Sequence, residues 1–188
     1  TGFYLFETSK ILEKEFKRAE TLPENSKERF GEYDGQKFDI MQEKENWSSG
    51  VLSSPPFVTC LVTKEIQKLF DEDKSLILAG SPRTVYEVEK LMPFLENLYG
   101  KENIKVVLLE IGVEQTIFRN SNRKICELMR HSIFYSAETE KLTRCPIDNS
   151  KLVKRAGLDN PETIKVRLKE YSERTIPMSD YFERNNFK

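Results

Sequence analysis

Arginine residues at the ends of predicted elements are the side chains of this sequence best suited to bind a phosphorylated substrate. Arg83 follows the apolar run SLILA at 75–79 and the turn residues GSP. Arg119 and Arg123 are four residues apart, so they share one face of a predicted helix. Arginine stays charged and can hold a phosphate through two parallel N–H groups. Several arginines that converge on one crevice would position and neutralise a polyphosphate, which is most of what phosphoryl transfer requires.

Two further arginines, Arg155 and Arg167, follow a segment of unusual composition. Residues 124–157 contain two of the three cysteines and the single histidine, and they interrupt an alternation of strands and helices. We therefore expect a small inserted subdomain with arginines on both sides of it. The alternative for each arginine is a solvated helix face, and the clustering of these positions at element ends weakens that alternative.

Apolar periodicity predicts the elements that must position these side chains. Buried strands are expected at 3–7, 75–79 and 104–111, and residues 21–56 are expected to form short helices and loops. Helices are expected over 8–20, 56–70, 84–98 and 113–122, and from 161 onward with a second segment past Pro177.

The alternation of these elements predicts an α/β fold in which a parallel sheet is covered by helices on both faces. Ligands of such sheets bind at the carboxyl ends of the strands, where we expect Arg83. Thr8 or Ser9 is expected to cap the first helix, because both side chains can accept a hydrogen bond from a helix N-terminus.

Composition excludes several classes of function. The 188 residues include 30 basic and 31 acidic side chains, so the net charge of −1 gives no general affinity for nucleic acid or anionic membranes. No apolar run approaches the roughly 20 residues of a membrane-spanning helix, and TGFYLFETSK lacks the layout of a secretory signal. Three cysteines do not suggest a disulfide framework, and Cys60 is expected to be a core thiol. A reducing, cytoplasmic setting is the expectation.

An ordered set of motifs resembles the adenylate kinase family of nucleoside monophosphate kinases, which convert ATP and AMP to two ADP. The turn GSPRT is similar to the family's GFPRT, in which the arginine holds the AMP phosphate. The segments FETSKILEKEF, SSGVLSS, RNSNR and RAGLDNPETIKVRLKEYSERT resemble further family segments in the same order and spacing. The similarity runs through nearly all 188 residues and is to the long-lid type of the family.

The resemblance implies a P-loop kinase-like, three-layer α/β fold. Its core would comprise 1–123 and 158–188, with a monophosphate-binding region at about 8–58 and a lid at 124–157. The implied catalytic residues are Arg83, Arg119, Arg123, Arg155 and Arg167, of which Arg119 and Arg123 would bind ATP. The implied AMP-binding residues are Thr8, Leu52, Gly80, Arg83 and Glu87. ATP and AMP would be the substrates of a monomer, with Mg²⁺ accompanying ATP.

The family's longer lid often carries a zinc ion on C-x2-C and, about sixteen residues on, C-x2-C or C-x2-D. This chain has Cys126-x2-Met129, fifteen residues, and Cys145-x2-Asp148. A thioether is a poor zinc ligand, and His131 could supply the fourth donor instead. The resemblance thus implies a zinc site of Cys126, His131, Cys145 and Asp148. The alternative is a lid turn held by hydrogen bonds and packing.

The phosphate-binding loop of the family has no counterpart, because no GxxxxGK occurs in this sequence. In the family that loop lies upstream of the segment matched by FYLFETSK. We therefore expect this chain to be a fragment that lacks the loop segment and the last strand. On that interpretation the parent protein is a phosphotransferase and this chain alone is inactive.

Four departures from the family pattern favour an alternative, a non-catalytic relative that binds nucleotides or a partner. They are Ala79 in place of an aspartate that organises magnesium, Ser9 in place of a glycine, Glu13 near an expected arginine, and Met129. Glu87, in the place of a glutamine that reads adenine, leaves the base preference open. The five arginines favour the kinase. A third alternative, a zinc-ribbon nucleic-acid binder, is disfavoured by the acidic balance and the missing ligand.

Overall fold

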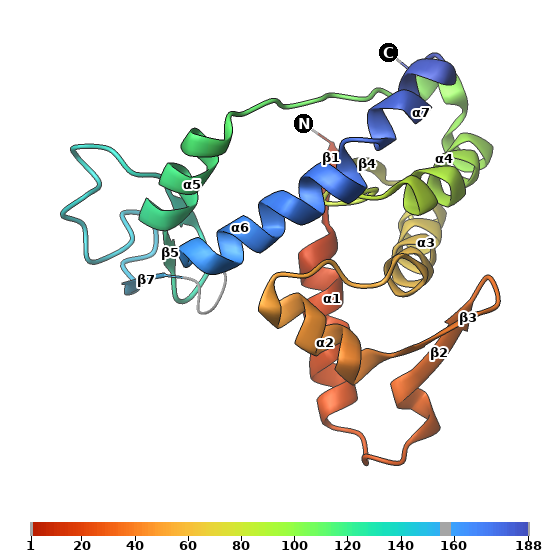
Figure 1. Ribbon diagram of the computed structural model, residues 1–188, viewed down its shortest axis with the longest axis horizontal. Coiled ribbons are helices and arrows are strands. Elements are labelled where there is room, and N and C mark those ends of the chain that lie inside the picture. Colours follow the sequence, from red (N-terminus) through yellow and green to blue (C-terminus); the bar gives the residue numbers. More distant parts are fainter. Residues whose placement is uncertain (1, 155–158, 188) are drawn as a thin grey trace. The chain divides into compact units, whose positions relative to one another are not determined.

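The structure, a computed structural model, describes residues 2–154 and 159–187 and divides into two compact units (Figure 1). The first unit comprises Thr1–Trp47, Leu52–Val107 and Glu170–Lys188, and the second comprises Ser48–Val51 and Leu108–Lys169. The second unit begins and ends outside the boundaries of 124 and 157 that the sequence suggests for an inserted lid. The lid boundaries therefore stay a prediction.

Two parallel strands form the sheet of the first unit. β1 (Phe3–Glu7) pairs with β4 (Ser75–Ala79) in a register that runs from Phe3 opposite Ser75 to Glu7 opposite Ala79. Both predicted strands are confirmed. Because the pair is parallel, the residues that follow the two strands emerge at the same edge, and Figure 1 shows α1 (Thr8–Glu20) continuing directly from β1.

The predicted helices are confirmed in type and place. They are α1, α3 (Pro55–Asp71), α4 (Val85–Tyr99), α5 (Val113–Asn122), α6 (Pro161–Glu170) and α7 (Met178–Arg184). A π-helical segment, Tyr171–Thr175, follows α6. The predicted cap of α1 is wrong, because Glu7 is the N-cap and no side chain closes it. β1 runs straight into the helix, so Thr8 is already its first helical residue.

The core of the first unit lies where α1, α3 and α4 pack together and against the sheet. The apolar positions of α3 recur at helical spacing, so one face of this helix is buried along its length. The largest fully buried side chains of this core are Phe6, Phe57, Val62, Ile66, Val88 and Leu91. This packing holds in place the edge of the sheet where β1 and β4 end and from which the chain continues into α1 and α4.

The strand predicted at 104–111 is wrong. These residues follow the 3₁₀ turn Lys101–Asn103 and form no strand, and Val107, Leu108 and Leu109 are 78%, 65% and 84% exposed. An extended segment becomes a strand only by pairing, and no strand within the described ranges pairs with it. The described residues form a helix-rich α/β structure with small sheets, so the three-layer sheet stays a prediction.

A β-hairpin occupies part of the region predicted as short helices and loops. After a 3₁₀ turn (Lys27–Arg29), β2 (Phe30–Tyr33) pairs antiparallel with β3 (Gln36–Asp39), and α2 (Ile40–Ser49) follows. Asp34 and Gly35 both have positive φ, 55° and 74°, as a two-residue hairpin turn requires. The Asp34 carboxylate accepts from Tyr86 Oη at 3.2 Å and pairs with Lys90 Nζ at 2.8 Å. These contacts attach the hairpin tip to α4.

The second unit contains a three-stranded antiparallel sheet with the order β6-β5-β7. Its strands are β5 (Lys124–Cys126), β6 (Ser132–Ile133) and β7 (Leu152–Val153). The buried cluster beside it consists of Cys126, Cys145 and Leu152. Over the described ranges, no helix of either unit combines the length and apolarity needed to cross a bilayer.

Candidate functional site

The carboxyl ends of β1 and β4 place Thr8, Gly80 and Arg83 beside one another. Thr8 follows β1 directly, and Gly80 follows β4 with a φ of +102°. A Cβ atom added to Gly80 would lie 3.0 Å from Arg83 Nη2 and 3.5 Å from Thr8 Oγ1. The missing side chain therefore lets the guanidinium and the hydroxyl approach the strand ends. All three are residues predicted from the sequence to bind AMP, and the structure brings them together.

The Thr8 hydroxyl is buried without a partner. Thr8 is 3% exposed, and the described part of the chain offers its Oγ1 no hydrogen bond. A buried hydroxyl left unpaired costs about 1–3 kcal/mol of folding free energy. Such groups are rare in native proteins, and a ligand that completes the bond is one physical explanation.

Glu87 is built into the N-terminal cap of α4. Its carboxylate accepts from the Arg83 backbone N–H and from Thr84 Oγ1, both at 3.1 Å, while Thr84 Oγ1 accepts from the Glu87 N–H at 3.2 Å. This resembles a capping box, except that the carboxylate accepts from the N–H of the residue before the N-cap and from the N-cap hydroxyl. Burial raises the pKa of the Glu87 carboxyl, and the hydrogen bond from the Arg83 backbone acts against that rise. The cap thus engages both carboxylate oxygens of Glu87, which was predicted to bind AMP.

The raised pKa of Glu87 predicts how its replacement by glutamine will depend on pH. Below the ordinary value of 4.5 the carboxyl is protonated in both the folded and the unfolded chain. As the pH rises through 4.5 the unfolded chain ionises first, so the wild type loses stability until the raised pKa is passed. Glu87→Gln should therefore gain stability relative to the wild type between pH 4 and 7. Urea unfolding of both proteins across this range measures the effect, and a pH-independent difference would contradict it.

The backbone around Leu52 is held by side chains distant in sequence. The Leu52 N–H donates to Glu170 Oε2 at 3.2 Å, and Arg174 Nη1 donates to that oxygen at 2.8 Å and to the Leu52 carbonyl at 3.5 Å. The Ser54 N–H donates to Glu43 Oε2 at 2.7 Å. Leu52 was predicted from the sequence, whereas its partners Glu170 and Arg174 were not. Buried Glu43, at 5% exposure within an otherwise polar segment, has no local pattern that would reveal it.

Arg119 and Arg123 both line a cavity of about 160 Å³ in the second unit. The Arg119 guanidinium lies over the ring of Phe134 at 5.3 Å, and Arg123 Nη2 pairs with buried Asp159 at 2.8 Å and with Asn120 at 2.9 Å. The buried Nε of Arg123 has no partner in the described ranges. The cavity is lined by Ile111, Thr116, Arg119, Asn120, Arg123 and Phe134.

Of the other two predicted arginines, Arg167 is described by the structure. Arg167 lies on α6 beside Gly50, since a Cβ added to Gly50 would lie 3.4 Å from Arg167 Cγ and 2.6 Å from Thr163 Cγ2. Gly50 has a φ of +88°, which together with this close approach requires glycine. Arg155 lies outside the described residues.

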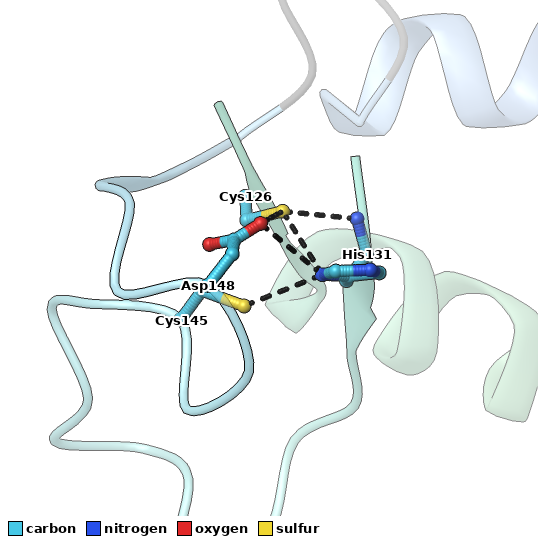
Figure 2. Close-up of side chains that lie close together, drawn as sticks. All are labelled: Cys126, His131, Cys145 and Asp148. Carbon is cyan, nitrogen blue, oxygen red and sulfur yellow. Dashed lines mark hydrogen bonds and ion pairs between the residues drawn. The ribbon is translucent and has the colours of Figure 1, made fainter. Parts of the chain in front are cut away.

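Four donor side chains converge in the second unit, and Figure 2 shows them pointing toward one another. His131 Nδ1 lies 3.4 Å from Cys126 Sγ, 3.5 Å from Cys145 Sγ and 3.3 Å from Asp148 Oδ2, and Cys126 Sγ lies 3.1 Å from that oxygen. Zinc bonds of about 2.3 Å to sulfur and 2.0–2.1 Å to nitrogen or oxygen put tetrahedral ligand atoms about 3.3–3.8 Å apart. These four separations are close to those of a tetrahedral zinc shell, and all of the donor atoms lie within 4.8 Å of one another.

Two similar turns carry these donors. The N–H of Arg130 donates to the Cys126 carbonyl at 3.1 Å, and the N–H of Asn149 donates to the Cys145 carbonyl at 2.9 Å. Arg130 and Asn149 both have a φ of 58°. Asp148 occupies in the second turn the position that Met129 occupies in the first, but Met129 is 64% exposed. His131, two residues further on, directs its ring into the cluster instead (Figure 2).

Ser150 orients the Asp148 carboxylate toward the other donors. Its N–H and Oγ both donate to Asp148 Oδ1, at 2.9 and 2.7 Å, which leaves Oδ2 facing Cys126 and His131. These bonds from Ser150 lower the pKa of Asp148 well below its usual range. The carboxylate is therefore ionised and held in place, as supporting partners of metal ligands usually ensure.

Comparison with known proteins found adenylate kinases, whereas no family model matches the chain. The chain is 34% identical over 146 residues to the adenylate kinase of Mycoplasma capricolum, covering 76% of this chain and 65% of that protein. It is 31% identical over 132 residues to that of Borreliella burgdorferi (69% and 59%) and 31% over 131 residues to that of Staphylococcus epidermidis (68% and 59%). The chain thus spans less than two thirds of the length of these relatives.

Proposed function

This chain is a relative of the adenylate kinases, and on that premise we propose that it serves phosphoryl transfer from ATP to AMP, giving two ADP. The observation that carries the proposal is the cluster at the carboxyl edge of β1 and β4. There the Arg83 guanidinium and the unpaired Thr8 hydroxyl both lie close to Gly80. A fixed cation beside an unsatisfied donor at the end of a parallel sheet suits the phosphate of a monophosphate.

In this proposal the first unit binds AMP. Arg83 holds the phosphate, Thr8 completes the hydrogen bond that it lacks, and Gly80 gives the phosphate room. Leu52 presents its backbone segment to the base. Glu87 acts through the cap of α4, because its carboxylate oxygens already hold Arg83 and Thr84.

The second unit would bind ATP through Arg119 and Arg123. The Arg119 guanidinium and the Phe134 ring offer flat surfaces, and the unpaired Nε of Arg123 can donate to a phosphate oxygen. Arg167 and Arg155 complete the proposed set that neutralises charge during transfer. Mg²⁺ would enter with ATP, and we assign it no ligand from this chain, because Ala79 offers no carboxylate at the strand end.

We also propose that the cluster of Cys126, His131, Cys145 and Asp148 holds a structural zinc ion. Two thiolates, an imidazole and a carboxylate are ligands that zinc accepts, and their spacing supports a tetrahedral shell. Bound there, zinc would join the two turns and supply no reaction chemistry. His131 would take the role that exposed Met129 cannot fill.

The architecture that we propose for the protein is the three-layer parallel sheet of P-loop kinases, with 124–157 as a closing lid. The chain would act as a cytoplasmic monomer in a reducing setting, where the three cysteines stay free as thiols. The approach of lid and core during catalysis would exclude water from the transferring phosphoryl group.

Isothermal titration of the chain with AMP tests the function, with adenosine and inorganic phosphate as controls. AMP should bind, and each control should bind at least tenfold more weakly, because the proposed site uses base and phosphate together. Phosphoryl transfer with MgATP and AMP is measured in parallel. The absence of AMP binding would reject the proposal. Binding without transfer would agree both with a kinase chain that has no GxxxxGK loop and with the non-catalytic relative, whereas transfer by this chain would exclude the latter.

Thr8→Val should change stability and binding in opposite directions. Valine has nearly the shape of threonine and removes the unpaired buried hydroxyl, so the free energy of unfolding should rise by about 1 kcal/mol. AMP affinity should fall about fivefold to tenfold, because one hydrogen bond to the phosphate is lost. Urea unfolding and AMP titration measure the two effects. A variant that is less stable and binds AMP normally would show that the hydroxyl has a structural partner.

A further inference from the structure

The π-helical segment between α6 and α7 directs consecutive side chains at the two loops assigned to AMP. The Ile176 N–H donates to the Tyr171 carbonyl, five residues back, at 3.0 Å. A π turn holds one residue more than an α turn, so it rotates the following side chains by about 100° around the helix axis. Such turns are uncommon and are frequent at functional sites, which directs attention to what Arg174 and Thr175 contact.

Thr175 fixes the peptide of Arg83. Its Oγ1 donates to the Arg83 carbonyl at 2.8 Å, while the Arg83 N–H donates to Glu87 Oε2 at 3.1 Å. Both polar backbone groups of Arg83 are thus bound by side chains from different elements. The direction in which the Arg83 side chain projects from the strand end depends on the backbone conformation that these two hydrogen bonds hold.

Arg174 and Glu170 fix the peptide of Leu52 in the same manner. Glu170 accepts from the Leu52 N–H at 3.2 Å, and Arg174 Nη1 reaches the Leu52 carbonyl at 3.5 Å. The two side chains are paired with each other at 2.8 Å, so each restricts the other. Of the four polar backbone groups of Leu52 and Arg83, three are therefore held by residues 170–175.

We propose that Glu170, Arg174 and Thr175 are positioning residues for AMP, which hold the base-side loop at Leu52 and the phosphate-side turn at Arg83 in fixed relation to each other. The inference rests on the proposed function and adds three residues that do not touch the substrate. A displacement of about 1 Å at a substrate-binding group can reduce activity a hundredfold, so the loss of one such contact should weaken AMP binding measurably.

Thr175→Val and Arg174→Gln test the proposal through AMP affinity, measured by titration beside the melting temperature. Each variant should bind AMP at least about tenfold more weakly than the wild type. Thr175→Ser keeps the hydroxyl and should restore affinity to within twofold. Arg184→Gln is the matched control, because the Arg184 guanidinium also binds a backbone carbonyl, that of Asp180 at 3.0 Å, within its own helix. It should leave AMP affinity unchanged.

Three results would overturn the inference. AMP affinities of Thr175→Val and Arg174→Gln within twofold of the wild type would do so and leave the proposed function intact. Equal losses in Thr175→Ser and Thr175→Val would show that the hydroxyl is not the cause. A wild type that does not bind AMP rejects the proposed function first and this inference with it. If Thr175→Val does not fold, the comparison of Arg174→Gln with Arg184→Gln decides.

Discussion

Replacement of Arg83 by alanine is expected to weaken AMP binding by at least about a hundredfold with little change in stability. A guanidinium that holds a phosphate through two charge-assisted hydrogen bonds contributes about 3 kcal/mol or more, which corresponds to that factor. The fold should tolerate the change, because Arg83 as a residue is exposed, even though partial burial of its guanidinium lowers the pKa of that group. The cap of α4 uses only its backbone N–H, which alanine retains.

AMP titration and thermal unfolding of the variant test this expectation together. Arg83→Lys keeps the charge and loses the paired donors, so its affinity should lie between those of the wild type and Arg83→Ala. Arg184→Ala is the control for the loss of an arginine elsewhere. A melting temperature lowered by more than about 10 °C with unchanged AMP affinity would assign Arg83 to structure.

Cys145→Ser is expected to abolish zinc binding and to unfold the region of residues 124–153. Two of the three residues in the buried cluster of the second unit, Cys126 and Cys145, are themselves proposed ligands. Removal of the metal would therefore remove most of what holds the two turns together. Structural zinc contributes about 10–16 kcal/mol in zinc-finger peptides, far more than so small a core could replace.

Metal analysis of the purified chain and hydrogen exchange of residues 124–153 measure the effect. The wild type should contain one zinc ion per chain, and Cys145→Ser should contain almost none and exchange rapidly in this region. Met129→Ala is the matched control, because Met129 lies in the first turn but is exposed. Equal zinc content in Cys145→Ser and the wild type would reject the site, and loss of zinc in Met129→Ala would reject the ligand set.

Local pattern was sufficient to predict the helices and two of the strands. The spacing of apolar residues in α3 is a property of a short segment. Residues 104–111 have an equally clear apolar pattern and form no strand, because a strand also requires a partner. The hairpin β2–β3 could have been found, since Asp34-Gly35 between alternating residues is a strong hairpin signal.

The candidate sites also combine residues that local sequence predicts with contacts that it does not. Thr8, Gly80 and Arg83 follow predicted strands, so their meeting at one edge follows from the parallel pairing of β1 with β4. Cys126, His131, Cys145 and Asp148 were predicted as a set of donors from the family resemblance, and the structure brings the four side chains together. Glu170 and Arg174 reach Leu52 across 118 and 122 residues, and no local pattern encodes such a contact.

The exposed segment IKVVLLEI has a consequence for how this chain behaves in concentrated solution. Val107, Leu108, Leu109 and Ile111 are exposed, and no strand within the described ranges pairs with the segment, which is the state that intermolecular β-sheets recruit when chains aggregate. Lys105 and Glu110 stand inside the run as charged gatekeepers, and charges in such positions oppose stacking of one chain on the next. When chains stack in parallel register, each of these charges meets its like on the next chain, so solubility should depend on ionic strength because salt screens that repulsion.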